Sequence, residues 1–109
     1  EALAAAKALG DEGISVEVLD PRSLYPLDKD LIAQSLSKTH KAVIVTEENR
    51  RGGPQHQISA SIAEEMFDYL DAPVIRLGAL DTPVPFAPVL EQAYLPNAQD
   101  IIKAVREQA

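Results

Sequence analysis

A short, uninterrupted apolar run, Ala42-Val43-Ile44-Val45, sets the strongest limit on the fold of this chain. A run of this length without polar alternation is typical of a strand that is covered on both faces, as in a parallel sheet. Residues 73–77 form a second short stretch of strand type, and residues 14–19 alternate apolar and polar side chains. The sequence therefore predicts three strands, at residues 14–19, 42–45 and 73–77.

Helical periodicity fills the intervals between these strands. Asp28 is placed as the N-cap of one helix, and Asn97 with Asp100 resembles a capping box before the last one. The predicted helices cover residues 1–12, 29–36, 55–70, 89–95 and 98–106. Helices between parallel strands require right-handed crossovers, which place helices on both faces of the sheet. The sequence therefore predicts an α/β fold, a three-layer α/β/α sandwich with a mostly parallel sheet.

The start of the chain bears on domain organisation. Three strands make a thin sheet, and the chain opens with a helix that no strand precedes. We therefore expect a further strand upstream of Glu1, which would complete a regular unit. On this interpretation residues 1–109 are one domain of a longer polypeptide.

Composition excludes several classes of function. The chain carries 17 acidic and 10 basic residues, a net charge of −7, which disfavours a nucleic-acid partner. It has no cysteine, so disulfides, thiolate catalysis and cysteine-ligated zinc are excluded. No apolar run approaches the length of a transmembrane helix, so we expect no membrane-spanning helix.

The loop from Glu47 to His56 is the sharpest candidate site, because it follows a predicted strand and leads into a helix. Its arginines and glycines could hold a small anion against free backbone N–H groups, and His56 could act as a general base. The favoured alternative is a tight turn whose arginines pair with nearby glutamates or with a neighbouring subunit. No nucleotide-binding motif is present. The candidate residues are Arg50, Arg51, Gly52, Gly53 and His56.

Two other segments are candidates for an interface. Arg22 follows the first predicted strand and could pair with a carboxylate of its own loop or of a partner. The segment Asp81–Pro88 is apolar and contains Pro83, Pro85 and Phe86, so it loses little entropy when it docks. Phe86 could anchor against its own domain or against another subunit. No catalytic, cofactor-binding or metal-ligating residue is predicted.

Two stretches resemble a known family. Val18-Leu19-Asp20-Pro21-Arg22-Ser23-Leu24-Tyr25-Pro26-Leu27-Asp28 resembles the signature of the C-terminal domain shared by transketolase-like, thiamine-diphosphate-dependent enzymes. Further stretches narrow the resemblance to one group within this family. They are residues 67–76, residues 81–88 and the ending with Leu95-Pro96 and Asp100-Ile101-Ile102. They resemble the beta subunit of a 2-oxo acid dehydrogenase decarboxylating component, of pyruvate or acetoin dehydrogenase type.

The resemblance implies a domain without catalytic residues, whose sheet has its first, central strand upstream of Glu1. In that family thiamine diphosphate and magnesium lie between an alpha subunit and the N-terminal domain of the beta subunit, outside this chain. The implied partners are the alpha subunit, a second beta subunit and the peripheral subunit-binding domain of the acyltransferase. The implied parent reaction is oxidative decarboxylation of a 2-oxo acid with acyl transfer to a lipoyl group, and pyruvate is the favoured substrate. The implied location is the cytoplasm, with the mitochondrial matrix or plastid as alternatives.

Two other interpretations remain at this stage. The loop from Arg50 to His56 departs from the family, which commonly has an aromatic residue before its Gly-Gly pair. This leaves room for a regulatory module that binds a small anion or another ligand. The chain could also be the C-terminal domain of another transketolase-like enzyme, such as a transketolase or a deoxyxylulose phosphate synthase. The segment Asp81–Pro88 argues against the latter.

Overall fold

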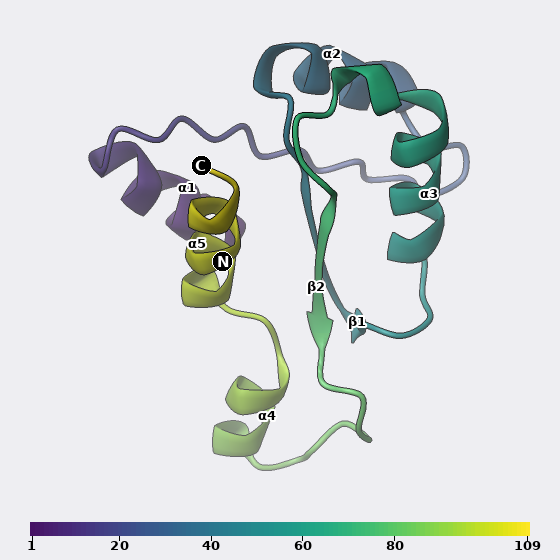
Figure 1. Cartoon of the computed structure of the whole chain (residues 1–109). Helices are drawn as coiled ribbons and strands as arrows, with labels where there is room; N and C mark the ends of the chain where they lie inside the picture. The colour runs from purple at the N-terminus through teal and green to yellow at the C-terminus, as the bar shows by residue number, and fades with distance from the viewer.

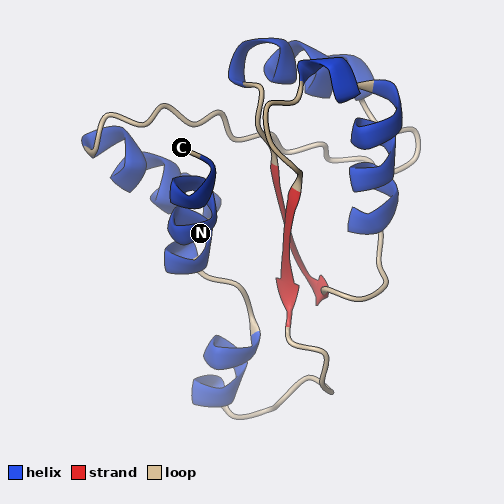
Figure 2. Cartoon of the chain, viewed as in Figure 1, coloured by secondary structure: helices blue, strands red, loops and turns tan.

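The computed structural model describes all 109 residues and has three layers. Two strands form the middle layer, with α1 and α5 on one side and α2 and α3 on the other (Figures 1 and 2). This arrangement confirms the predicted α/β fold. The elements are α1 (Ala2–Asp11), α2 (Lys29–Thr39), β1 (Val43–Asn49), α3 (Gln55–Glu65), the 3₁₀ helix η1 (Phe67–Tyr69), β2 (Ile75–Ala79), α4 (Pro88–Tyr94) and α5 (Ala98–Gln108).

The sheet consists of β1 and β2, which run parallel. Val43 pairs with Ile75 and Val45 with Leu77, but the register shifts before Asn49, which pairs with Ala79. At this shift the backbone of β1 lies so close to Gly78 that a Cβ atom there would be 2.8 Å from the Cα of Arg50. Only glycine fits at this point of β2 without a backbone displacement.

Two hydrophobic cores lie on opposite faces of the sheet. On one face, Val45 and Leu77 pack against a cluster from α1 and α5 that contains Ala5, Leu9, Ile101 and Ile102. On the other face, Ile44 and Val74 pack against a second cluster. It consists of Leu36 from α2, Ile62 from α3 and Met66, which directly follows α3. Neighbouring residues of a strand point to opposite faces, so both Ile44 and Val45 must be apolar. This explains the uninterrupted apolar run in the sequence.

The predicted strand at residues 14–19 is wrong. This segment forms no ladder with β1 or β2, and within it only Ile14 makes a backbone hydrogen bond, to Leu9. Its alternating pattern has another cause. Ile14 and Val16 pack against the core of α1 and α5, while Glu17 accepts hydrogen bonds from Ser35 and Lys38 of α2. A strand needs a neighbouring strand at its edge, and β1 is paired with β2 alone in these residues.

Helix ends follow local capping signals. The side chain of Asp28 accepts a hydrogen bond from the N–H of Leu31, and Asn97 and Asp100 form a reciprocal capping box, as predicted. The predicted helix 55–70 is too long, because the backbone leaves helical geometry at Met66 before η1. No helix combines the length and the apolar character needed to cross a bilayer.

Candidate functional site

The β1–α3 loop, residues 50–54, is held in place from inside by Gln55, the first residue of α3. Its side chain is 0% exposed, and its Nε2 donates to the carbonyl oxygens of Asn49 and Arg50 at 2.9 and 3.0 Å. Its Oε1 accepts a hydrogen bond of 3.1 Å from the hydroxyl of Thr46. Gly52 has a φ of +83°, a left-handed conformation that favours glycine. The buried amide therefore fixes the path of the loop, a role the sequence analysis did not assign.

Arg51, Gly52 and His56 of the predicted loop residues make contacts within the chain. The Nε of Arg51 lies 3.6 Å from Asp81, and the N–H of Gly52 donates to Nε2 of His56 at 2.7 Å. Arg76 of β2 joins the group, since its Nη1 donates to the carbonyl of Arg50 at 3.1 Å. The same Nη1 lies 3.1 Å from Nδ1 of His56. These contacts favour the turn interpretation, although Arg51 pairs with Asp81 and not with the expected Glu47 or Glu48. The small-anion site stays a prediction.

Arg22 lies in a local turn of its own. Its N–H donates to Asp20 at 3.1 Å, and its Nε lies 3.5 Å from the same carboxylate. Both side chains are exposed. The contact is the ion pair within one loop that the sequence analysis considered, and a role for Arg22 at an interface stays a prediction.

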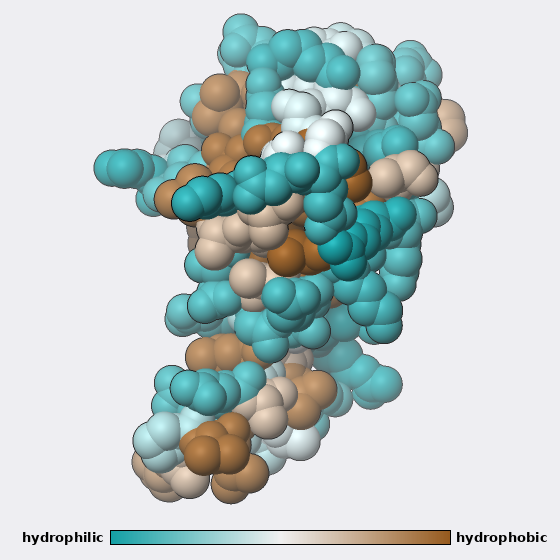
Figure 3. Space-filling model, turned by 90° about the vertical axis from the view of Figure 1, so that its left-hand side faces the viewer, coloured by the Kyte–Doolittle hydropathy of each residue, from teal (hydrophilic) through white to brown (hydrophobic).

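An exposed apolar surface surrounds Phe86, whose side chain is fully in solvent at 101% exposure. Figure 3 shows apolar surface gathered at the lower end of the molecule, where α4 lies in Figure 1. Phe86 is therefore not anchored on its own domain, and that alternative is wrong. An anchor on another subunit stays a prediction. Pro83 is exposed and Pro85 half-buried beside it. We call the exposed apolar residues of this segment the Phe86 patch; they are Leu80, Val84, Phe86, Val89 and Leu90.

The Phe86 patch is fixed to the sheet at its ends. Tyr94, at the end of α4, is 7% exposed, and its hydroxyl donates to Oδ1 of Asn49 at 2.6 Å. The N–H of Leu80 donates to the carbonyl of Tyr94 at 3.1 Å. Asn49 thus receives Tyr94 on its side chain and Gln55 on its backbone. The patch and the β1–α3 loop share one anchor.

An open hollow of about 580 Å³ lies where β1 ends. It brings together residues from two separately predicted candidates, since Arg51 and Gly53 of the loop line it together with Pro83. We call it the carboxylate hollow, because Glu47 and Glu48 also line it. The remaining lining residues are Asn49, Thr82, Val84 and Tyr94.

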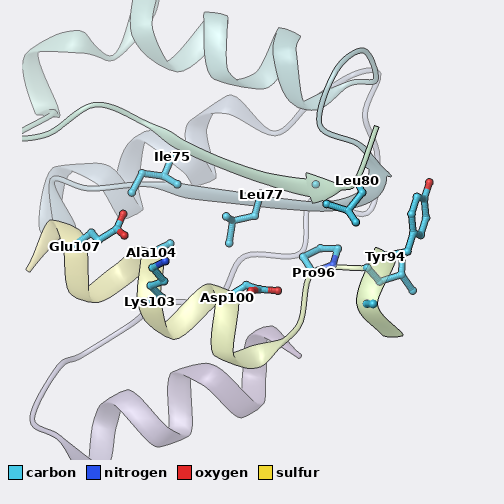
Figure 4. Close-up of a pocket in the computed structure, with 12 residues that line it drawn as sticks. Ile75, Leu77, Leu80, Tyr94, Pro96, Asp100, Lys103, Ala104 and Glu107 are labelled. Carbon is cyan, nitrogen blue, oxygen red and sulfur yellow. The ribbon is translucent and has the colours of Figure 1, made fainter. Parts of the chain in front are cut away.

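A second hollow, of about 360 Å³, runs along β2 and contains none of the predicted site residues. Figure 4 shows Ile75 and Leu77 on its β2 side and Lys103 and Ala104 on its α5 side.

No group of three or more histidine, cysteine, aspartate or glutamate side chains is arranged to hold a metal ion. The residues present therefore do not fit a magnesium site, and we derive no chemical step through one.

A parallel sheet between two helical layers, with an apolar patch at one end, defines this chain as an α/β/α domain. The family described as "Transketolase, C-terminal domain" matches residues 1–101, and the chain belongs to this family. This confirms the resemblance seen in the sequence.

Three relatives show the range of named enzymes to which the chain is similar. It is 50% identical to the beta subunit of acetoin:2,6-dichlorophenolindophenol oxidoreductase of Bacillus subtilis, over 97% of this chain and 31% of the relative. It is 48% identical to mitochondrial pyruvate dehydrogenase E1 component subunit beta-1 of Arabidopsis thaliana, over 94% of this chain and 28% of the relative. It is 41% identical to the 2-oxoisovalerate dehydrogenase subunit beta of Bacillus subtilis, over 99% of this chain and 33% of the relative. The chain thus spans about a third of the length of these relatives.

Proposed function

We propose that this chain is the C-terminal domain of the beta subunit of a thiamine-diphosphate-dependent 2-oxo acid dehydrogenase. The parent enzyme would decarboxylate a 2-oxo acid, with pyruvate as the favoured substrate. It would transfer the acyl group to an oxidised lipoyl group, which is reduced. The observation that carries the proposal is the family match over residues 1–101, together with three relatives that are named as beta subunits. The relatives differ in substrate, so pyruvate is the narrower part of the proposal.

Within that enzyme the domain serves assembly. The support is the Phe86 patch, because exposed apolar side chains gathered in one segment are typical of a protein interface. The partner is the alpha subunit or a second beta subunit, and the acyltransferase binding domain would dock on the assembled enzyme. Thiamine diphosphate and magnesium would be held by parts of the enzyme outside these residues. The location proposed is the cytoplasm, with the mitochondrial matrix or plastid as alternatives, since several relatives are named as mitochondrial.

The experiment replaces Phe86 by alanine in the whole beta subunit and measures its assembly with the alpha subunit by sedimentation. Loss of an aromatic anchor costs an interface about 2 kcal/mol or more, which is roughly a thirtyfold loss of affinity. We therefore expect Phe86→Ala to dissociate the assembly at concentrations where the unchanged enzyme stays intact. Phe67→Ala is the matched control, because Phe67 is an exposed aromatic on η1, outside the patch. Equal sedimentation of Phe86→Ala and the unchanged protein would contradict the assembly role.

A further inference from the structure

We propose that His56 holds the β1–α3 loop only while its imidazole ring is neutral, so that the loop is released by acid. We call the contact between the N–H of Gly52 and Nε2 of His56 the His56 latch. This inference concerns a pH-sensitive device within the domain, and it does not depend on the proposed function.

The tip of the loop, residues 51–53, is held by a single hydrogen bond. The N–H of Gly52 is the one backbone group of these residues that makes a hydrogen bond, and its acceptor is Nε2 of His56 at 2.7 Å. Packing adds nothing at Gly52, where a Cβ would meet no atom within 4 Å. The ion pair of Arg51 with Asp81 is exposed, and such pairs contribute little. The position of the tip therefore depends on the His56 latch.

The direction of this hydrogen bond fixes the protonation state of His56. An imidazole nitrogen accepts a hydrogen bond only when it carries no proton, so the neutral ring has its proton on Nδ1. The doubly protonated ring has a donor at both nitrogens and cannot accept from Gly52. A proton on Nε2 would therefore abolish the latch and set two N–H groups against each other.

Arg76 of β2 adds a charge effect in the same direction. Its Nη1 lies 3.1 Å from Nδ1 and 3.5 Å from Nε2 of His56. Because it is close to both nitrogens, this atom lies over the face of the ring and not beyond one nitrogen in the ring plane. Arginine stacks well on the face of a neutral ring. A protonated ring would instead place a second positive charge beside Arg76.

The other charged groups around His56 do not offset this repulsion. The first turn of α3 contains no acidic residue, and no carboxylate forms an ion pair with His56. The charged residues of the loop and of the end of β1 are Arg50, Arg51, Glu47 and Glu48. The carboxylate of Glu48 lies over Gly53. Arg76 is therefore the charged group in direct contact with the ring.

Release of the latch would be confined to the tip of the loop. Gln55 keeps its hydrogen bonds to the carbonyl oxygens of Asn49 and Arg50, because its amide does not titrate. His56 is exposed, so its ring can turn into solvent without leaving a cavity in a core. Acid would thus free residues 51–53 while the junction of β1 and α3 stays in place.

The test measures hydrogen exchange by mass spectrometry in the full-length protein, with fragmentation that resolves the N–H of Gly52. An amide that loses its hydrogen bond loses its protection from exchange. Rates at about pH 8 and about pH 5 are compared, since histidine side chains generally change charge between these values. After correction for the intrinsic effect of pH on exchange, we expect Gly52 to exchange about tenfold faster at the lower pH.

Three variants assign the effect to His56. His56→Gln offers an amide oxygen that accepts a hydrogen bond and does not titrate, so we expect Gly52 to stay protected at both pH values. His56→Ala has no acceptor, and we expect fast exchange at both. His40→Asn is the matched control, because His40 is the other histidine of the chain and contacts the carbonyl oxygen of Tyr69 instead. Asparagine tolerates the φ of +61° at this position, and we expect the pH effect to remain.

Several outcomes would overturn the latch. An exchange rate of Gly52 that does not change with pH in the unchanged protein refutes it, and that measurement needs no variant. A pH effect that persists in His56→Ala, or that disappears in His40→Asn, refutes it as well. The N–H groups that join β1 and β2 report on global unfolding. If they lose protection at about pH 5 to the same degree as Gly52, the domain opens as a whole and the latch is refuted.

Discussion

Gly78 illustrates how one residue limits the sheet. A Cβ at this position would lie 2.8 Å from the Cα and N of Arg50 and 2.8 Å from the carbonyl oxygen of Glu48. All three are backbone atoms, which cannot move aside as the end of a side chain can. The close approach results from the register shift between Val45 and Asn49, so glycine in β2 and the shift in β1 belong together.

We predict that Gly78→Ala lowers the free energy of unfolding by about 1–3 kcal/mol, the range typical of overpacking. Urea denaturation followed by circular dichroism measures the change. Gly10→Ala is the control, because a Cβ there meets no atom within 4 Å and the residue lies inside α1. In a helix this exchange stabilises by about 0.5–1 kcal/mol. Two variants of equal stability would contradict the steric argument.

At the scale of elements, β1 and α3 are joined by a buried side chain rather than by backbone bonds alone. Gln55 satisfies two carbonyl oxygens at the end of β1 and is itself satisfied by Thr46. A buried amide that makes all these contacts fixes the angle between strand and helix, because each lost contact leaves a polar group without a partner.

We predict that Gln55→Leu destabilises the chain by about 1–3 kcal/mol, because the carbonyl of Asn49 and the hydroxyl of Thr46 lose their hydrogen bonds to Gln55, while the carbonyl of Arg50 keeps its bond from Arg76. Gln57→Leu on the same helix is the matched control, since Gln57 is exposed. The midpoint of urea denaturation compares the two. If Gln57→Leu costs as much as Gln55→Leu, the effect comes from leucine in the helix and not from the lost hydrogen bonds.

Across the whole molecule, two ion pairs attach the segment after α1 to different layers. Glu12 pairs with Arg106 of α5, and Glu17 pairs with Lys38 of α2. The hydrogen bond from Arg106 lowers the pKa of Glu12 below its usual value. Hydrogen bonds from Lys38 and then Ser35 lower the pKa of Glu17. Since this segment joins no sheet, these contacts and the packing of Ile14 and Val16 are what place it.

The pH dependence of stability follows from these lowered pKa values. A carboxyl whose pKa is lower in the folded state contributes stability above its unfolded pKa, and this contribution is lost as pH falls through the folded value. We therefore expect the urea midpoint to fall on acidification below pH 4.5, the usual pKa of these groups. Glu12→Gln with Glu17→Gln should flatten this fall, while Glu64→Gln should not. A pH profile that the double variant leaves unchanged would contradict the role of the two pairs.

The sequence predicted what local patterns encode. The caps at Asp28 and Asn97 depend on residues three positions apart, and the apolar run at 42–45 reports burial on both faces. The strand at residues 14–19 failed because pairing depends on a neighbour that the alternating pattern does not specify.

The contacts that organise the candidate site could not be predicted in the same way. Asn49 and Tyr94 are 45 residues apart, and no periodicity connects them. Gln55 looks like an ordinary polar residue in the first turn of a helix, and only the fold buries it. The proline segment was predicted as an interface from its apolar composition, and its exposure agrees with that hypothesis without testing it.

The open ring of Phe86 has a consequence for a copy of this domain that has no partner. Such a copy would present the kind of surface through which proteins aggregate. Chaperones and proteases in cells act continuously on protein molecules that expose apolar groups. Under the proposed assembly role, unassembled copies would therefore be removed faster than assembled ones.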